Sequence, residues 1–304
     1  MEIEDRLERI GSSMIYDIVA NGGHEAFEKL VLKIPTTMND LMERGVRFEL
    51  PVMQWAADSN GWAFEPADTL RWEQDGVPYR DTPDFWIKTN GKKILAEVKT
   101  HNMWIREQYG DEHSEDVPDR VFCQAQFHCA ANDAEECRVI PSFGGEKPLV
   151  YVVRRDRTVW KNIHAACVKF WKEHVETKIP PPADGTDGCT NLLNRRVRNN
   201  DDMMEALTED VAKHYRLAEV KAGIKGLTAE KNEISNYFKE RIGENLGIQN
   251  DAIRYTWKKN KDREVINYDG LLAEANLDPE LIAKYTRTVE GSRVLKSLKP
   301  KKVK

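Results

Sequence analysis

The segment TPDFWIKTNGKKILAEVK, Thr82 to Lys99, contains two apolar stretches, FWI and ILAEV, on either side of TNGK. Aromatic and β-branched residues favour strands, and Asn-Gly is a strong signal for a tight turn, so the segment predicts a β-hairpin. Successive side chains of a strand point to opposite faces, which places Glu97 and Lys99 on one face and Val98 on the other. Asp84, on the first strand, can therefore converge with Glu97 and Lys99.

Two carboxylates that converge repel each other and are costly to bury, unless a divalent cation takes their oxygens as ligands. Asp84 and Glu97 are thus the acidic half of a candidate Mg²⁺ site. A lysine beside them can orient a water nucleophile or offset charge on a phosphate, as metal-assisted phosphodiester hydrolysis requires. The pattern predicts nucleic-acid cleavage. Its alternative is a solvated strand edge, since acidic residues often precede a lysine by two places in a chain that is 32% charged.

Further motifs flank the hairpin in a fixed order. They are RLERIGSS (6–13), RGVRFELP (44–51) with Gly and Glu in a G-x-x-x-E pattern, VFCQAQFHCAA (121–131) with a Q-x-Q pair, PLVYVVRRD (148–156), and FWKEHVETKIPPPADGTD (170–187). Together with the hairpin, these motifs resemble the PD-(D/E)xK nuclease superfamily, and within it the YqaJ-like viral recombinases typified by lambda exonuclease.

The resemblance implies a fold and a set of site residues. The fold is α/β: a restriction-endonuclease-like core with a central mixed β-sheet flanked by helices. Glu49, Asp84, Glu97 and the backbone carbonyl of Val98 are the implied ligands of Mg²⁺, with Mn²⁺ possible because an oxygen-rich site accepts either ion. Glu49 acts directly or through water. Lys99 is the implied catalytic lysine, and Gln124 holds the nucleophilic water or the Lys99 ammonium.

A phosphate site is implied as well. Arg6, Ser13 and Thr82 are candidates for binding a terminal 5′-phosphate, since guanidinium and hydroxyl groups suit that anion. The chain departs from the family in two places: Phe85 replaces the glycine that follows the aspartate, and Gly11 stands where lambda exonuclease has a hydroxyl residue. The nearby histidines, His101 and His128, are interpreted as structural.

By the same resemblance, the substrate is a double-stranded DNA end, degraded 5′ to 3′ to leave a 3′ single strand for a single-strand annealing protein of a phage-type recombination system. A homo-oligomeric ring trimer around DNA is expected. Two alternatives remain open, a DNA endonuclease of restriction or repair type and a non-catalytic DNA-binding assembly protein. RNA cleavage is disfavoured because no basic-aromatic RNA-binding signature occurs.

Composition restricts the class of protein and its location but does not identify a function. The net charge is −5, which neither supports nor excludes DNA binding because the local field along the bound backbone matters. No segment has the roughly 20 continuous apolar residues of a membrane span. The start, MEIEDRLERIG, has no apolar signal core. We therefore expect no membrane partner and a cytoplasmic location. The resemblance implies that the cell is a bacterial host and that the protein has a phage or prophage origin. The five cysteines include no C-x-x-C, and we interpret them as core or surface thiols.

Prolines and glycines in PPPADGTDG indicate a boundary. We predict a nuclease core over 1–180, a Pro/Gly-rich linker over 181–200, and a helical plus small α+β region with a basic tail over 201–304. The elements expected in the core are helices at 12–20, 23–32, 38–59, 117–133 and 158–177, and strands at 62–65, 69–73, 83–88, 93–99 and 148–154. In the third of these helices, the spacing of Leu41, Phe48, Val52 and Trp55 predicts packing on the sheet. Beyond the linker we expect helices at 201–222 and 227–242 separated by a bend, strands at AIRYTWK, REVINY and RVLKSL, a helix near 269–275, and a disordered tail.

Overall fold

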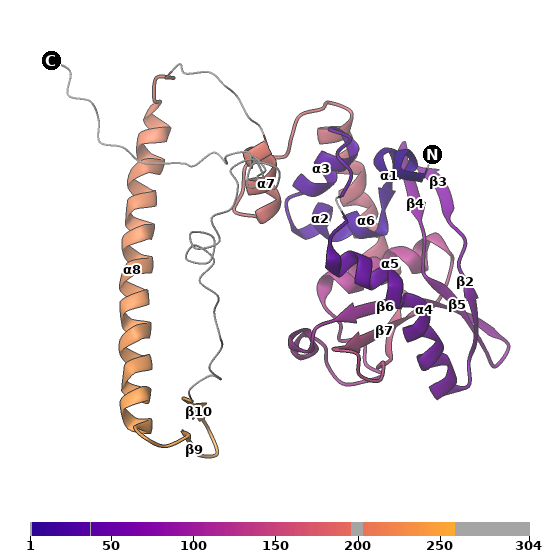
Figure 1. Ribbon diagram of the computed structural model, residues 1–304. Coiled ribbons are helices and arrows are strands. Elements are labelled where there is room, and N and C mark those ends of the chain that lie inside the picture. The colour runs from indigo at the N-terminus through magenta and orange to yellow at the C-terminus, as the bar shows by residue number, and fades with distance from the viewer. Residues whose placement is uncertain (1, 37, 196–202, 259–304) are drawn as a thin grey trace, which may run out of the picture. The chain divides into compact units, whose positions relative to one another are not determined.

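The computed structural model describes residues 2–36, 38–195 and 203–258 (Figure 1). The chain divides into two compact units, residues 1–197 and 198–304. The first unit is built on a five-stranded sheet of order β2-β5-β6-β7-β8. The strands of this sheet are β2 (Ala63–Pro66), β5 (Phe85–Thr89), β6 (Lys92–His101), β7 (Glu136–Phe143) and β8 (Tyr151–Arg154). Within this sheet only the β6–β7 pair is parallel, so the sheet is mixed, as predicted.

The predicted hairpin is confirmed. β5 and β6 pair antiparallel from Phe85 opposite Ala96 to Thr89 opposite Lys92. Asn90 and Gly91 form the turn, with φ of 49° and 72°. Positive φ at both central residues is the requirement of the hairpin turn that matches strand twist, and Asn-Gly meets it at little cost.

Two helices cover the two faces of the sheet. α4 (Asp40–Asn60) packs one face with Val52, Met53, Ala56 and Ala57, which share a core cluster with residues of β5 and β6. α5 (Asp119–Ala131) packs the other face in a second cluster. The prediction that Leu41, Phe48 and Trp55 face the sheet is wrong, because these side chains are exposed and only Val52 of that set is buried. The helix instead turns its alanines inward, and their small size permits close approach to the strands.

Two of the longer strands of the first unit were not predicted. β7 is the parallel partner of β6, and β4 (Val77–Asp81) lies in a second sheet of order β1-β4-β3 with β1 (Ile10–Gly11) and β3 (Leu70–Gln74). Both contain a proline, Pro141 in β7 and Pro78 in β4. Proline argues against assigning a central strand from sequence alone. In the structure, both strands are nevertheless well buried.

A third cluster joins the second sheet to η1 (Ser12–Met14), α2 (Ile15–Ala20), α3 (His24–Leu30), α6 (Arg157–Phe170) and η3 (Trp171–Val175). The two other helices of the first unit are α1 (Glu2–Glu8) and η2 (Met103–Gln108), and Ile105 of η2 packs against the second cluster. No described helix is both long and apolar enough to cross a membrane.

The expected linker at 181–200 is in part structured. It contains α7 (Asp187–Arg195), whose Cys189 and Leu192 are buried, and the first compact unit extends to residue 197. Proline and glycine do mark the turn before α7. The core nevertheless continues past them, because α7 supplies an apolar face that packs on α3.

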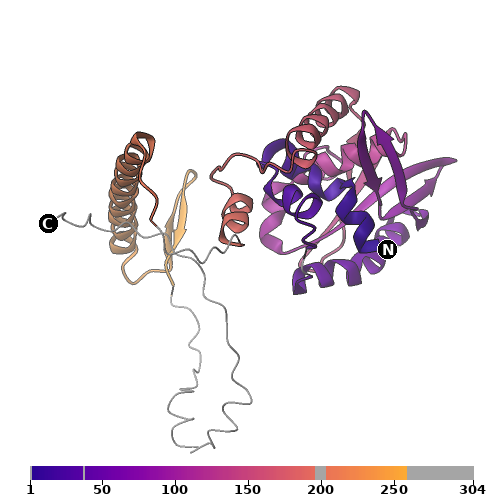
Figure 2. The ribbon, with the colours of Figure 1, turned by 90° about the horizontal axis from the view of Figure 1, so that it is seen from above.

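The second unit consists, in its described part, of α8 (Thr208–Ile242) and a hairpin of β9 (Gly247–Gln249) and β10 (Arg254–Thr256). The predicted bend is wrong: α8 is uninterrupted through Gly223 and Gly226 (Figures 1 and 2). An isolated glycine weakens a helix by about 1 kcal/mol without breaking it. The strands expected at REVINY and RVLKSL, the helix near 269–275 and the tail lie outside the described residues.

Candidate functional site: a carboxylate–lysine cluster

The structure brings the central predicted residues together where the pairing of the inner strands β5 and β6 ends. Asp84 immediately precedes β5, and Glu97 and Lys99 lie on β6. Gln124 lies on α5, the helix that covers the face of the sheet opposite α4. Glu49 comes from α4 and is near enough for the charges of Glu97 and Lys99 to shift its pKa. Elements far apart in sequence thus contribute to one cluster.

Asp84 is fixed by the backbone of the neighbouring strand. Its Oδ2 accepts a hydrogen bond of 2.7 Å from the backbone N–H of Val98. Pairing with β5 ends at Ala96, so this edge of β6 is open to the aspartate beyond that point. The N–H and C=O of one strand residue point to the same edge. The Val98 carbonyl therefore faces the Asp84 side as well, where the sequence predicted a ligand.

Glu97 is the centre of the hydrogen-bond network. The residue is 3% exposed. Its Oε1 accepts hydrogen bonds from the Lys99 ammonium and, at 2.6 Å, from Gln124 Nε2. Lys99 Nζ also donates to Gln124 Oε1 at 3.0 Å. The three side chains hold one another in a closed triangle, which fixes the ammonium next to the carboxylates.

A buried relay that the sequence did not reveal lies behind Glu97. His128 Nε2 is 3.1 Å from Glu97 Oε2, although the two atoms are not aligned as a hydrogen bond. On its other side, His128 Nδ1 is 2.7 Å from Asp81 Oδ1, and Asn132 Nδ2 donates to Asp81 Oδ2 at 2.8 Å. His128 follows Gln124 by four residues, so both lie on one face of α5. That spacing is the signal by which His128 could have been assigned a role.

The charges in this buried group of side chains shift the pKa values of His128 and Glu97 in opposite directions. Burial disfavours the charged form of His128, but the carboxylates of Asp81 and Glu97 outweigh it and raise the pKa of His128 to about 10. Burial likewise acts to raise the pKa of Glu97, but Lys99 and His128 outweigh it and lower that pKa to about 2. Glu97 is therefore ionised, between two cations, at any physiological pH.

The other two carboxylates are in a different electrostatic state. Burial, reinforced by repulsion from Glu97, raises the pKa of Asp84 well above its usual value. Burial and the charge of Glu97 also raise the pKa of Glu49. For Lys99, burial favours the neutral amine, but Glu97 and Asp84 overcome it and the pKa is raised. The charge of Lys99 acts to lower the pKa of Asp84 and of Glu49 but does not offset burial and Glu97, while Lys99 itself stays protonated.

The donor set fits a hard divalent cation. It offers carboxylate oxygens of Glu49, Asp84 and Glu97 and the Val98 carbonyl, and oxygen is the ligand atom that Mg²⁺ and Mn²⁺ prefer. One observation supports the fit. Burial, and after it repulsion from Glu97, raises the pKa values of Asp84 and Glu49, and a bound cation would offset both effects.

The predicted phosphate-binding residues lie on separate elements. Arg6 lies on α1, Ser13 on η1 and Thr82 between β4 and β5, and all three side chains are exposed. Thr82 Oγ1 is 3.1 Å from Thr69 Oγ1. Their role with a 5′-phosphate stays a prediction. Gln126, the second glutamine of the Q-x-Q pair, is buried and ties α5 to Arg154 and Asp156.

The fold and site define a class: an α/β protein with a mixed sheet and an acidic, lysine-containing cluster at a strand edge. Solved structures similar to this chain include an alkaline exonuclease (LHK-Exo) from Laribacter hongkongensis, at 16% identity and a TM-score of 0.47, with 58% of this chain and 92% of that chain covered. A phage-related exonuclease from Haemophilus somnus 129PT has 11% identity and a TM-score of 0.41, covering 56% and 96%. A putative exonuclease from Eubacterium rectale has 10% identity and a TM-score of 0.43, covering 69% and 94%. No protein-family model and no curated protein matches the sequence.

Proposed function

We propose that this chain is a Mg²⁺-dependent deoxyribonuclease that degrades duplex DNA from its ends. The observation that carries the proposal is the closed triangle of Glu97, Lys99 and Gln124 beside the Val98-bound Asp84. A structural salt bridge needs one acid and one base, whereas here three carboxylates, those of Glu49, Asp84 and Glu97, lie near one protonated lysine. That excess of buried acid is what a metal-dependent phosphodiesterase requires.

Each residue then has a defined task. Glu49, Asp84, Glu97 and the Val98 carbonyl would hold the ion, which when bound supplies charge to activate water and stabilise the leaving 3′ oxygen. Lys99, kept protonated by Glu97 and Asp84, offsets the negative charge that grows on the attacked phosphate. Gln124 holds the Lys99 ammonium through its carbonyl oxygen and Glu97 through its amide.

The finer features of the proposal rest on the resemblance of the motifs to the YqaJ-like family. They are 5′ to 3′ polarity, a terminal phosphate bound by Arg6, Ser13 and Thr82, a ring trimer, and delivery of the 3′ strand to an annealing protein in a phage-type recombination system. The place of action would be the bacterial cytoplasm.

The deciding assay compares two substrates. With Mg²⁺, wild-type protein is expected to digest linear duplex DNA bearing 5′-phosphates and to leave covalently closed circular DNA intact. Lys99→Ala is expected to lower the rate on linear DNA by about 10²–10³-fold, since it removes a charge aimed at the transition state. Lys93→Ala is the matched control, because Lys93 is an exposed lysine of the same strand that pairs with Glu65. End-labelling either strand then gives the polarity.

Other outcomes would change the assignment. Cutting of the circle would make the protein an endonuclease. Binding without cleavage would favour a DNA-binding assembly protein, and equal loss in Lys93→Ala and Lys99→Ala would remove Lys99 from the mechanism.

Activity should depend on pH and Mg²⁺ together. Asp84 must lose its proton to bind the ion, and its raised pKa makes it hold that proton to a higher pH than a free aspartate does. Activity should therefore fall as pH decreases, and more Mg²⁺ should shift this acidic limb to lower pH because ion and proton compete for one carboxylate. Single-turnover rates measured across pH at several Mg²⁺ concentrations test this. A limb that does not move with Mg²⁺ would contradict the ligand role of Asp84.

A further inference from the structure

A second group of ligand-type side chains lies away from the carboxylates, between α3 and α7. His24 begins α3, Asp184 precedes α7, and Cys189 lies within α7. One ligand atom from each of the three lies within 4.8 Å of the others. None of these residues belongs to the Glu97 cluster.

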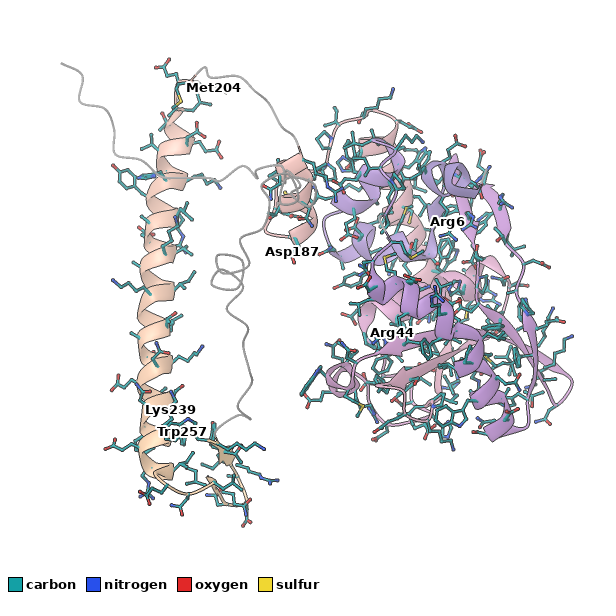
Figure 3. All side chains as sticks on the ribbon, viewed as in Figure 1. Arg6, Arg44, Asp187, Met204, Lys239 and Trp257 are labelled. Atoms are coloured by element: carbon teal, nitrogen blue, oxygen red, sulfur yellow. The ribbon has the colours of Figure 1, made fainter. Side chains whose placement is uncertain are left out.

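The packing of α7 on α3 holds these residues in place. Leu192 of α7 is buried in the core, and Arg195 Nη1 pairs with Glu28 Oε2 of α3 at 2.7 Å. Gly188 lies against the start of α3, since a Cβ built there would be in van der Waals contact with the His24 Cβ at 3.4 Å. Figure 3 labels Asp187, where α7 begins.

His24 is a buried imidazole without a hydrogen-bond partner. Its side chain is 1% exposed, and neither ring nitrogen has a hydrogen bond within the described part of the chain. Asp184 Oδ2 is 3.4 Å from its Nε2. A buried polar group left unpaired is costly, and native structures rarely contain one without a ligand or a water.

The other two side chains are oriented for the same purpose. Asp184 Oδ1 accepts hydrogen bonds from the backbone N–H and hydroxyl of Thr186, at 2.9 and 2.6 Å, which leaves Oδ2 on the His24 side. Cys189 is buried, and its Sγ accepts a 3.4 Å hydrogen bond from the backbone N–H of Asp184. Such a donor stabilises negative charge on sulfur, as metal-bound thiolate carries.

We propose that His24, Asp184 and Cys189 bind one zinc-class divalent ion. Imidazole nitrogen, thiolate sulfur and carboxylate oxygen are the ligand types of Zn²⁺, whereas Mg²⁺ prefers oxygen alone. Bonds of about 2.0–2.3 Å put tetrahedral ligands about 3.5 Å apart, so a small inward rotation of these side chains closes the site. Water takes the fourth position. Binding displaces the thiol proton of Cys189 to solvent.

The consequence is structural. The ion joins the start of α3 to the segment before and within α7, and so closes a loop that spans nearly the whole first unit. Closing so long a loop lowers the conformational entropy of the unfolded chain. The expected role is to hold α7 on the core, separately from the proposed nuclease chemistry.

Cobalt substitution tests the proposal on the full chain. The metal-free protein receives Co²⁺ with excess Mg²⁺ present, so that the oxygen-rich cluster is occupied by Mg²⁺. A thiolate-to-cobalt charge-transfer band is expected at one equivalent, and an all-oxygen site cannot give this band. The band should vanish in Cys189→Ser and persist in Cys123→Ser, whose cysteine is partly exposed and lies on α5.

A second variant keeps the test decisive if Cys189→Ser fails to fold. Asp184→Asn retains the thiol and changes an exposed carboxylate, and it should weaken Zn²⁺ binding by at least about tenfold in competition with a chromophoric chelator. Zn²⁺ should also raise the thermal midpoint of wild type more than that of Asp184→Asn. Absence of the band in wild type, its loss in Cys123→Ser, or unchanged Zn²⁺ affinity in Asp184→Asn would overturn the proposal.

Discussion

Replacing Glu97 by glutamine is expected to lower the rate of DNA cleavage by at least about 10³-fold. The change removes the charge that would bind the metal, and it also breaks the local hydrogen-bond pattern. If the amide oxygen stays toward Lys99 and Gln124, the new NH₂ faces the protonated His128 ring 3.1 Å away. If the amide flips, the NH₂ faces the donors of Lys99 and Gln124. Either orientation places donor against donor.

The measurement is the single-turnover cleavage rate on linear duplex DNA over a range of Mg²⁺ concentrations. Glu65→Gln is the matched control, because Glu65 lies on the same sheet and pairs with Lys88 and Lys93 at the surface. DNA binding by Glu97→Gln should persist, since a negative charge is removed, and circular dichroism shows whether the variant is folded. A rate within about threefold of wild type would exclude Glu97 as a metal ligand.

Replacing His128 by leucine is expected to destabilise the protein by about 3–5 kcal/mol, which is the usual result of leaving buried charges without their partner. Asp81 is fully buried and Glu97 nearly so, and His128 is the cation between them. Leucine fills much of the ring volume but supplies neither charge nor hydrogen bond. Urea-induced unfolding of both proteins gives the difference in the free energy of unfolding.

The loss of unfolding free energy caused by His128→Leu should become smaller as pH rises. The pKa of His128 is raised to about 10 in the folded protein, against about 6.5 in an unfolded chain. Its stabilising contribution is therefore complete below about pH 6.5 and is lost as pH rises through 10. The deficit of His128→Leu relative to wild type should shrink over that interval.

The double variant with Asp81→Asn is the control for this interpretation. Removing the buried acid together with the base should recover part of the lost stability, because the remaining asparagine is neutral and still paired with Asn132. A cost below about 1 kcal/mol for His128→Leu alone would show that the relay is not charged as described.

Local sequence patterns predicted that Asp84, Glu97 and Lys99 lie close together, and the structure confirms this proximity. Hairpin propensity, the Asn90-Gly91 turn and the two-residue period of a strand are local properties, and they suffice to relate Asp84, Glu97 and Lys99 to one another. The packing of α4 was mispredicted because periodicity favours its large apolar residues. The helix in fact buries its alanines, a choice that depends on the shape of the sheet it meets.

The sequence by itself determined the hairpin, the acid–lysine cluster and the Gln124 helix, because each follows from spacing within a single element or between adjacent ones. Only the tertiary structure decided that Asp81 and His128, 47 residues apart, meet behind Glu97, and that His24 lies against Asp184 and Cys189. Contacts of this kind form when whole helices dock on a sheet or on each other. Docking is governed by buried area and shape across the fold, which no local periodicity records.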